Sequence, residues 1–199
     1  MQSVSIHIPS EELCRQIISD LGMLENIVAH SLQVCRVSLL LTDRLGLAGL
    51  NRELIRAAAL LHDVTKTRSF HTDEDHAETG ARLLADLGYP EVAGIVGQHV
   101  RLDRYVLNSS PPTDAEIVNY SDKRVLHDKI VPLSERMGYI LEKYGRSPER
   151  KRNILLLWEK TEKLEKRLFA GLPFSPGDLS GMLSEGGSSR DCQGLSQSL

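Results

Sequence analysis

The feature that most restricts how this chain can fold is a set of polar residues on helix faces that should be buried. Apolar residues recur at helical spacing along most of the 199 residues, which predicts an all-α fold, a compact multi-helix bundle. Five successive predicted helices each place one imidazole or carboxylate on the apolar face: His30, His62, His76, His99 and Asp122. Burying such a group without a partner is costly, and burying a bare carboxylate is far more so. The bundle must therefore provide partners for all five.

Two interpretations of these five residues compete. A single histidine at such a position is most often a satisfied core or boundary residue, and a single aspartate is a cap or an ion-pair partner. Five coincidences on five successive helices favour a shared partner instead, because clustering around one or two cations would remove the burial cost of all of them. Imidazole and carboxylate ligands suit Fe, Mn, Zn, Co or Ni, and the lack of thiolate ligands argues against a soft metal.

The stretch AAALLHDVTK, residues 57–66, adds a sixth polar group, because Asp63 directly follows His62. Neighbouring residues on a helix point about 100° apart, so both side chains can reach one ion only near the end of the helix. We expect the helix to end there, before VTKTRSF. Lys66 lies one turn beyond His62 and could hold a phosphate oxygen beside the ion. On its own, Lys66 is better interpreted as a solvated lysine that the helix dipole favours.

A second His-Asp pair occurs in RVLHD, residues 124–128. If the helix of Asp122 continues through this stretch, Asp122 faces inward with the apolar residues. His127 then lies on the side of Lys123 and Arg124. We therefore expect His127 and Asp128 near the rim of the site or in a salt bridge with Arg124, with a contact between His127 and substrate as the alternative.

Capping residues and composition divide the chain into parts. Ser10 and Asn51 are expected to cap helices, Thr72 or Asp73 to cap another, and Thr113 to start one with a capping box. The last residues are rich in Gly and Ser with little apolar pattern, which is typical of disorder. The predicted parts are a helix at 1–24 that packs on the core, a core at 25–133, C-terminal helices at 134–172 and a disordered tail at 173–199.

Charge and cysteine content exclude several classes of protein. The formal net charge is −3, so no strong overall field favours nucleic acid or an anionic membrane. The three cysteines are far apart and form no CxxC, which argues against a disulfide framework or a cysteine zinc site. No signal peptide and no run of about 20 apolar residues is found. We expect a cytoplasmic protein with no membrane and no nucleic-acid partner, and its oligomeric state stays open.

The ordered set of these residues resembles the HD-domain superfamily of metal-dependent phosphohydrolases, in the manner of a stand-alone, HDIG-like domain. The resemblance covers about residues 25–133 and is carried by NIVAHSLQVCRVS, ELIRAAALLHDVTK, HAETGARLLADLGYP, IVGQHV and IVNYSDKRV. It implies that His30, His62, Asp63 and Asp122 bind a first divalent ion. His76 and His99 would bind a second ion that Asp63 bridges, or, with one ion, would contact phosphate or donate a proton.

The resemblance also implies a reaction, namely hydrolysis of a phosphate ester or anhydride by attack of a metal-activated water. Asp63 and Lys66 would be catalytic, with one or two Fe or Mn ions, or Co, Ni or Zn, as cofactor. Lys66, Arg68, Arg101 and His127 are the candidate contacts to a small phosphorylated substrate such as a nucleotide, a cyclic nucleotide or a dinucleoside polyphosphate. Two other classes stay open: a di-iron oxygenase of the same superfamily, and a non-catalytic metal-binding signalling module. Val64-Thr65 departs from the frequent Ile-Gly, and QHV offers one histidine where some dinuclear members have two.

Overall fold

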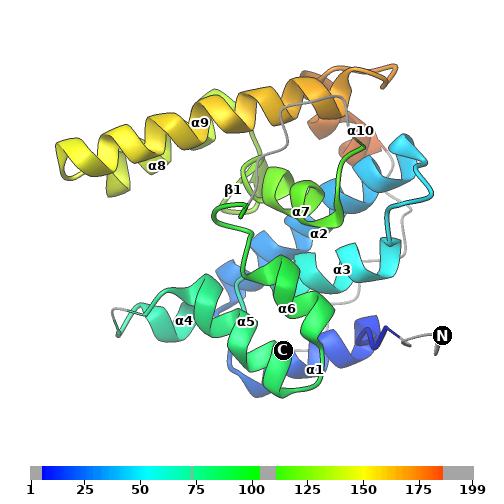
Figure 1. The fold of residues 1–199 in the computed structure, drawn as a ribbon, viewed down its shortest axis with the longest axis vertical. Helices are drawn as coiled ribbons and strands as arrows, with labels where there is room; N and C mark the ends of the chain where they lie inside the picture. Colours follow the sequence, from blue (N-terminus) through cyan, green and yellow to red (C-terminus); the bar gives the residue numbers. More distant parts are fainter. Residues whose placement is uncertain (1–5, 73, 104–110, 186–199) are drawn as a thin grey trace.

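The computed structural model describes residues 6–72, 74–103 and 111–185. It is mostly helical, as predicted, with one small two-stranded sheet. At its centre α2 (Glu25–Leu45) packs on α3 (Arg52–Leu61), and α6 (Pro90–Val96) and α7 (Asp114–Asp122) contact α3 from other sides (Figure 1). The other helices are α1 (Glu11–Asp20), α4 (Lys66–Ser69), α5 (His76–Asp86), α8 (Leu133–Tyr144), α9 (Pro148–Phe169) and α10 (Leu179–Glu185).

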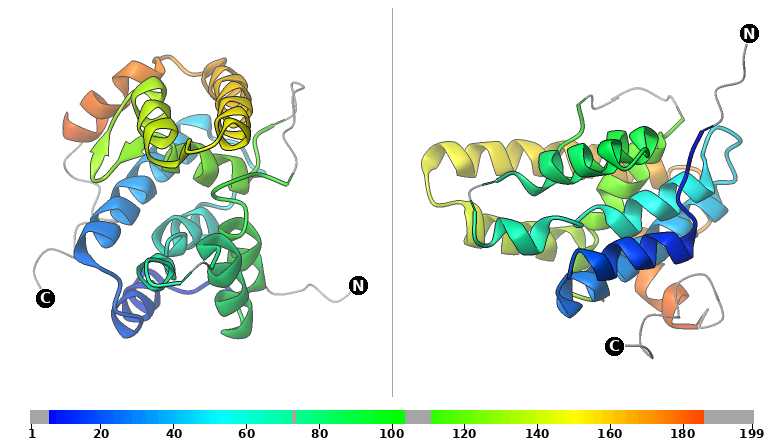
Figure 2. Two further views of the ribbon diagram at one scale, coloured as in Figure 1. Left: turned by 90° about the vertical axis from the view of Figure 1, so that its left-hand side faces the viewer. Right: turned by 90° about the horizontal axis from the view of Figure 1, so that it is seen from below.

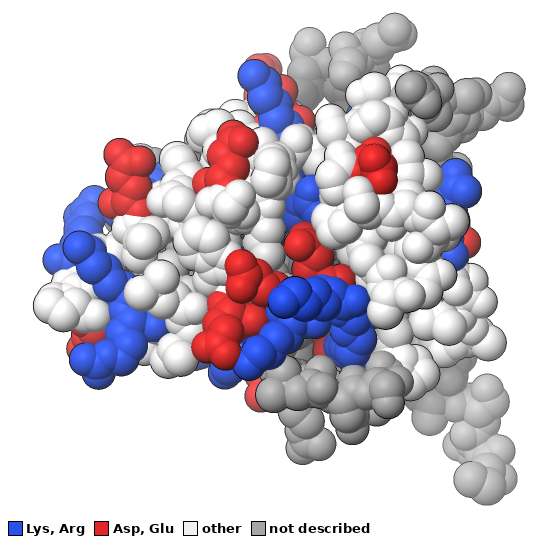
Figure 3. Space-filling view, turned by 90° about the horizontal axis from the view of Figure 1, so that it is seen from above, with Lys and Arg blue, Asp and Glu red and all other residues white. Residues whose placement is uncertain are grey.

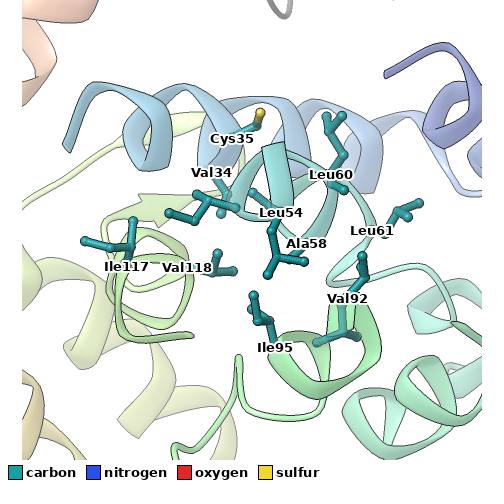
Figure 4. Packing of buried hydrophobic residues seen from close by; sticks show 14 of the residues in the cluster. Val34, Cys35, Leu54, Ala58, Leu60, Leu61, Val92, Ile95, Ile117 and Val118 are labelled. Carbon is teal, nitrogen blue, oxygen red and sulfur yellow. The ribbon is translucent and has the colours of Figure 1, made fainter. Parts of the chain in front are cut away.

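The hydrophobic core lies where the four central helices meet. Val34 of α2, Leu61 of α3 and Val118 of α7 are fully buried, and Ile95 of α6 is nearly so. Figure 4 shows these side chains directed into one shared space between the helices. Because a packed core is as dense as an organic crystal, it fixes how the helices lie against one another. The central helices, or the residues just after they end, also carry most of the polar residues identified in the sequence.

Helix starts follow the capping signals with one exception. Ser10 and Asn51 cap α1 and α3 through their side chains, and Thr113 forms a complete capping box with Glu116 at the start of α7. For α5 the cap is Asp75, whose carboxylate accepts hydrogen bonds from the first-turn amides, in place of the predicted Thr72 or Asp73. Asp73 itself lies outside the described residues.

The stretch after Asp122 differs from the helix that the sequence suggested. The helix α7 ends at Asp122, and β1 (Val125–Leu126) pairs with β2 (Lys129–Ile130) in an antiparallel hairpin. His127 and Asp128 form its two-residue loop, and His127 has a φ of 56°, which is uncommon for a residue other than glycine. Two-residue hairpin loops require such left-handed backbone.

The helices α8 and α9 form a pair that projects from one end of the bundle (Figures 1 and 2). Buried charges hold α9 to α7. The Arg124 guanidinium donates to the Tyr120 hydroxyl at 2.6 Å and lies 3.2 Å from a Glu165 carboxylate oxygen. Arg167 pairs with Glu116 in the same interface. None of the helices in the described part of the chain combines the length and hydrophobicity that a membrane span requires.

Part of the segment predicted as a disordered tail, residues 176–185, is helical in the structure. A short 3-10 helix at Pro176–Asp178 leads into α10, and Leu179 is fully buried. Ser175 caps this turn reciprocally with Asp178, a signal that the Gly- and Ser-rich composition obscured. The carbonyl of Pro176 accepts a hydrogen bond from Arg124 at 2.9 Å, which ties this segment to the domain. The rest of the predicted tail, residues 186–199, lies outside the described residues.

Matched leucine substitutions test the location of the core. Leu41 of α2 is 0% exposed, whereas Leu155 of α9 is 51% exposed. We expect Leu41→Ala to lower the free energy of unfolding by about 2–5 kcal/mol, because it removes buried apolar surface and leaves a cavity. Leu155→Ala is expected to change it by less than about 0.5 kcal/mol. Urea unfolding of both variants measures the difference, and equal effects would contradict the described packing.

Candidate metal centre

Six side chains from five helices or helix ends meet at one place in the bundle. We call this set the His/Asp cluster; its members are His30, His62, Asp63, His76, His99 and Asp122. Five of the six are buried, and only His76 is partly exposed. The structure therefore brings together all the metal ligands that the sequence predicted. That they bind metal stays a prediction, and the distances between their donor atoms show whether the spacing suits an ion.

One group of donors surrounds Asp122. Its Oδ1 atom lies 3.0 Å from Nε2 of His30 and 3.8 Å from Nε2 of His62. Asp63 Oδ2 lies 3.4 Å from the same His62 atom and 4.0 Å from that of His30. Because ion–ligand distances for such donors are about 2.0–2.2 Å, ligand atoms on one ion lie about 3–4 Å apart. The spacing of these four donors fits one ion.

A second group uses the other oxygen of Asp63. Its Oδ1 atom lies 3.3 Å from Nε2 of His76 and 3.4 Å from Nε2 of His99. The two imidazole nitrogens are 3.2 Å apart. These three atoms have the mutual spacing of ligands on a single ion, and they share Asp63 with the first group. The arrangement therefore allows a carboxylate that bridges two ions, as well as a single ion with two free histidines.

The backbone fixes which nitrogen each buried histidine presents. Nδ1 of His62 lies 2.8 Å from the Ala59 carbonyl, and Nδ1 of His99 lies 2.7 Å from the Val96 carbonyl. Nδ1 of His30 lies 2.9 Å from the carbonyl of His127. Since a carbonyl only accepts, Nδ1 donates in each case, and Nε2 is the nitrogen left to face the other side chains of the cluster. All three Nε2 atoms point into the cluster.

Unsatisfied buried atoms test whether the cluster suits a cation. Nε2 of His62 and Oδ1 of Asp63 are buried and have no hydrogen-bond partner among the described residues. Such atoms are costly unless another group completes them. Burial favours the neutral acid, but the adjacent His62 and the Lys66 ammonium outweigh it and hold the pKa of Asp63 well below its usual range. A buried anion with an open donor atom among four imidazoles fits a divalent cation.

The helix ends explain how adjacent residues reach one place. The helix α3 ends at Leu61, so His62 and Asp63 lie at its end and both side chains turn toward the cluster, as the sequence predicted. His76 is the first residue of α5. The Thr65 hydroxyl donates to the His76 carbonyl at 2.8 Å, which ties the segment after α3 to the start of α5. The sequence Val64-Thr65, where the related pattern frequently has Ile-Gly, therefore supplies a hydroxyl that holds this connection.

The predicted substrate contacts are placed unequally. Lys66 donates from Nζ to Asp63 Oδ2 at 2.7 Å and so lies in the centre. Arg68 instead pairs with Glu74 on the surface at 2.9 Å, and Arg101 is exposed in the loop after α6. His127 is exposed in the hairpin loop, and it supplies its carbonyl, not its ring, to His30.

Two cations near the cluster were missed in the sequence. Lys123 was expected on the outer side of its helix, but it is buried, and its Nζ donates to the His99 carbonyl at 2.8 Å. Burial lowers its pKa to about 8. Arg136 of α8 lies 3.8 Å from Asp122 Oδ1. The adjacency of Lys123 to Asp122 was a usable signal, whereas Arg136 is remote in sequence and carried none.

A separate cavity lies between the hairpin, α9 and the start of α10. It has a volume of about 330 Å³, and its lining includes Arg124, Glu162, Glu165 and Ser180. None of the six cluster residues lines it. The cavity is therefore distinct from the candidate metal centre.

Comparisons with known proteins identify a matching family and several similar proteins. The family model described as HD domain matches residues 27–125. A tRNA (cytidine(56)-2'-O)-methyltransferase of Picrophilus torridus is 28% identical over 66% of this chain and 40% of its own length. Ribonuclease Y of Deinococcus radiodurans is 34% identical over 38% of this chain and 13% of its own length, and the Treponema denticola ribonuclease Y is similar at 32% over 14% of its length.

One solved structure is also similar. It is described as a predicted HD superfamily hydrolase from an uncultured Thermotogales bacterium, with 17% identity and a TM-score of 0.47 over 84% of this chain and 95% of that chain. The chain spans well under half of the length of the curated relatives it matches. The family match covers about half of the sequence and contains all six residues of the His/Asp cluster. The chain is an HD-domain protein.

Metal content tests the cluster directly. We expect wild type purified without chelator to carry one or two transition-metal ions per chain in elemental analysis. Asp63→Ala should lose them, because Asp63 belongs to both donor groups. Asp128→Ala is the matched control, since Asp128 is exposed in the hairpin loop. If wild type binds no ion and takes up neither Mn nor Fe, the cluster is no metal centre.

Proposed function

We propose that this protein is a metal-dependent phosphohydrolase that cleaves a phosphate ester or anhydride of a nucleotide or dinucleoside polyphosphate. One observation carries the proposal. Two donor groups share the buried Asp63 carboxylate, and the Lys66 ammonium lies 2.7 Å from that same carboxylate. Such a centre offers ligands for one or two cations beside a fixed positive charge. The HD domain at residues 27–125 supports the same chemistry.

The residues divide between holding metal and handling substrate. His30, His62 and Asp122, with Asp63, would hold one ion, and His76 and His99, with Asp63, a second. A bound divalent ion supplies a lowered pKa for coordinated water and charge stabilisation for phosphoryl oxygens. Fe and Mn suit this mixed imidazole and carboxylate set, with Co, Ni and Zn as alternatives. If only one ion binds, His76 and His99 are free to contact phosphate or transfer a proton.

The charges around the centre favour an anionic substrate. Lys66 and Arg136 balance the charges of Asp63 and Asp122. Because these four charges cancel, each divalent ion that binds would give the centre a net positive charge. That charge would attract phosphate. Asp63 holds Lys66, so the ammonium is positioned before substrate arrives and needs no reorganisation to stabilise charge on a phosphoryl oxygen.

The relatives favour a second substrate class, the phosphodiester bonds of RNA. Two of them are ribonucleases by name, although the similarity covers only 13% and 14% of their length. The face that carries α9 shows Lys and Arg interspersed with Asp and Glu, with basic residues gathered where α8 ends and α9 begins (Figure 3). A charge pattern this mixed suits a small ligand better than a long polyanion. We therefore rank a small nucleotide first.

A phosphate-release panel tests the reaction class. The panel contains nucleoside mono- and triphosphates, a dinucleoside polyphosphate, a cyclic nucleotide and a short RNA. We expect wild type to hydrolyse at least one of them, to lose activity with a chelator and to regain it with Mn or Fe. Asp63→Asn should lower kcat/KM by about 10³-fold or more, because the shared ligand loses its charge. Asp128→Asn should retain activity.

Other outcomes separate the alternatives. Oxygen consumption by iron-loaded protein without phosphate release would establish an oxygenase and overturn the proposal. Bound metal with neither activity would leave a metal-binding signalling module. Cleavage of RNA alone would assign the second substrate class.

Lys66→Met tests the fixed ammonium. We expect kcat/KM to fall by about 10²-fold, because one preorganised charge beside the phosphoryl group is lost. Lys163→Met serves as the control, since Lys163 is an exposed residue of α9. Elemental analysis of Lys66→Met shows whether the metal is retained. Unchanged kinetics with full metal content would remove Lys66 from the mechanism.

A further inference from the structure

Arg136 reaches the metal centre from outside the segment that matches the HD domain. It belongs to α8, beyond residue 125, and its Nη2 atom lies 3.8 Å from Asp122 Oδ1. Its side chain is only 13% exposed. An arginine buried to this extent beside a candidate metal ligand has either a structural role or a ligand of its own.

The contacts of Arg136 argue against a purely structural role. The 3.8 Å separation from Asp122 is longer than a hydrogen bond, and the same oxygen of Asp122 lies 3.0 Å from His30. Nε of Arg136 is buried without a hydrogen-bond partner among the described residues, and none of its other nitrogens donates a hydrogen bond to them. A guanidinium carries five N–H donors in a planar fork that matches phosphate. These donors are available to an anion at the centre.

A second cation acts on the same place. Lys66 donates to Asp63 Oδ2 at 2.7 Å, and Arg136 lies 3.8 Å from Asp122 Oδ1. Those two carboxylate oxygens lie 3.4 Å and 3.8 Å from the same atom, Nε2 of His62. Each of the two carboxylates thus has one of these cations beside it, and two like charges placed in this way repel each other. A phosphate group between them would relieve that repulsion, and it would complete the unsatisfied donors of Arg136.

Two aromatic rings lie near the guanidinium. The Arg136 guanidinium lies 5.9 Å from the centre of the Tyr139 ring, one turn along α8. The exposed His127 ring packs edge-on against Tyr139, with 5.6 Å between the ring centres. Aromatic faces bind nucleobases by stacking with little regard to sequence, and a neighbouring arginine binds the phosphate. Arg136 thus lies near both a candidate metal ligand, Asp122, and an aromatic pair, Tyr139 with His127.

We infer that Arg136 is the phosphate-binding residue for a nucleoside phosphate, and that Tyr139 and His127 form the surface on which its base lies. The inference rests on the proposed function and names the residues that would bind the phosphate and the base of its nucleotide substrate. It also assigns the specificity of the centre to the hairpin loop and α8. The HD-domain match ends at residue 125 and includes neither.

Binding of two probes to the metal-loaded protein tests the inference. The probes are adenosine 5'-monophosphate and inorganic phosphate, measured by titration calorimetry. Arg136→Gln is expected to weaken both by about 10- to 100-fold with unchanged metal content, because the charged fork is lost. Arg136→Lys should restore part of the affinity. Arg152→Gln is the matched control, an exposed arginine of α9 that should leave both affinities unchanged.

Tyr139→Leu separates base from phosphate. It should weaken the nucleotide by about tenfold and leave inorganic phosphate unchanged, because only stacking is removed. Equal weakening of both probes would overturn the role given to the rings. Unchanged affinities in Arg136→Gln, or loss of metal in that variant, would overturn the role given to Arg136. In the second case its function is to hold Asp122.

The binding and hydrolysis measurements together distinguish failure of this inference from failure of the proposed function. Binding that depends on Arg136, without hydrolysis of any substrate on the panel, would contradict the hydrolase and leave the binding surface standing. Hydrolysis that is indifferent to Arg136→Gln would leave the hydrolase standing and contradict the surface. If wild type binds neither probe, the inference fails.

Discussion

The rest of the structure depends on the burial of one carboxylate, Asp63, in the middle of a helical bundle. An isolated buried anion is among the costliest features a protein can contain. Here four imidazoles and the Lys66 ammonium surround it, and they come from four parts of the chain: α2, the segment after α3, the start of α5 and the turn after α6. The positions of α2, α3, α5 and α6 can be understood as the arrangement that supplies these partners at once. The apolar core packs around that arrangement and holds it.

The backbone does as much as the side chains to prepare the centre. Three carbonyl groups, those of Ala59, Val96 and His127, fix the tautomer of the histidines that they contact. Two of them belong to α3 and α6, and each lies three residues before the histidine that it contacts. The third comes from the hairpin loop, where the left-handed backbone of His127 is accommodated. Ligand geometry is thus set by secondary structure as well as by packing, and this keeps the donor atoms aimed without a bound partner.

The sequence predicted the helical fold and the membership of the cluster because both leave local signals. A histidine on an apolar face, such as His30, is visible from helical periodicity alone, and the caps Asn51 and Thr113 mark helix starts. The hairpin was missed because its turn has no glycine. Arg136 was missed because its proximity to Asp122 depends on how α8 folds back, which no local pattern records. Such contacts between distant segments decide specificity and are the hardest to predict.

The central claim is that the two donor groups, which share the Asp63 carboxylate, bind divalent ions. Anomalous diffraction from crystals of Mn-loaded protein tests this most directly. The account predicts a peak within ligand distance of Nε2 of His62 and of the Asp63 carboxylate, and, if two ions bind, a second peak between His76 and His99. A peak elsewhere on the molecule, or none at saturating metal, would contradict it.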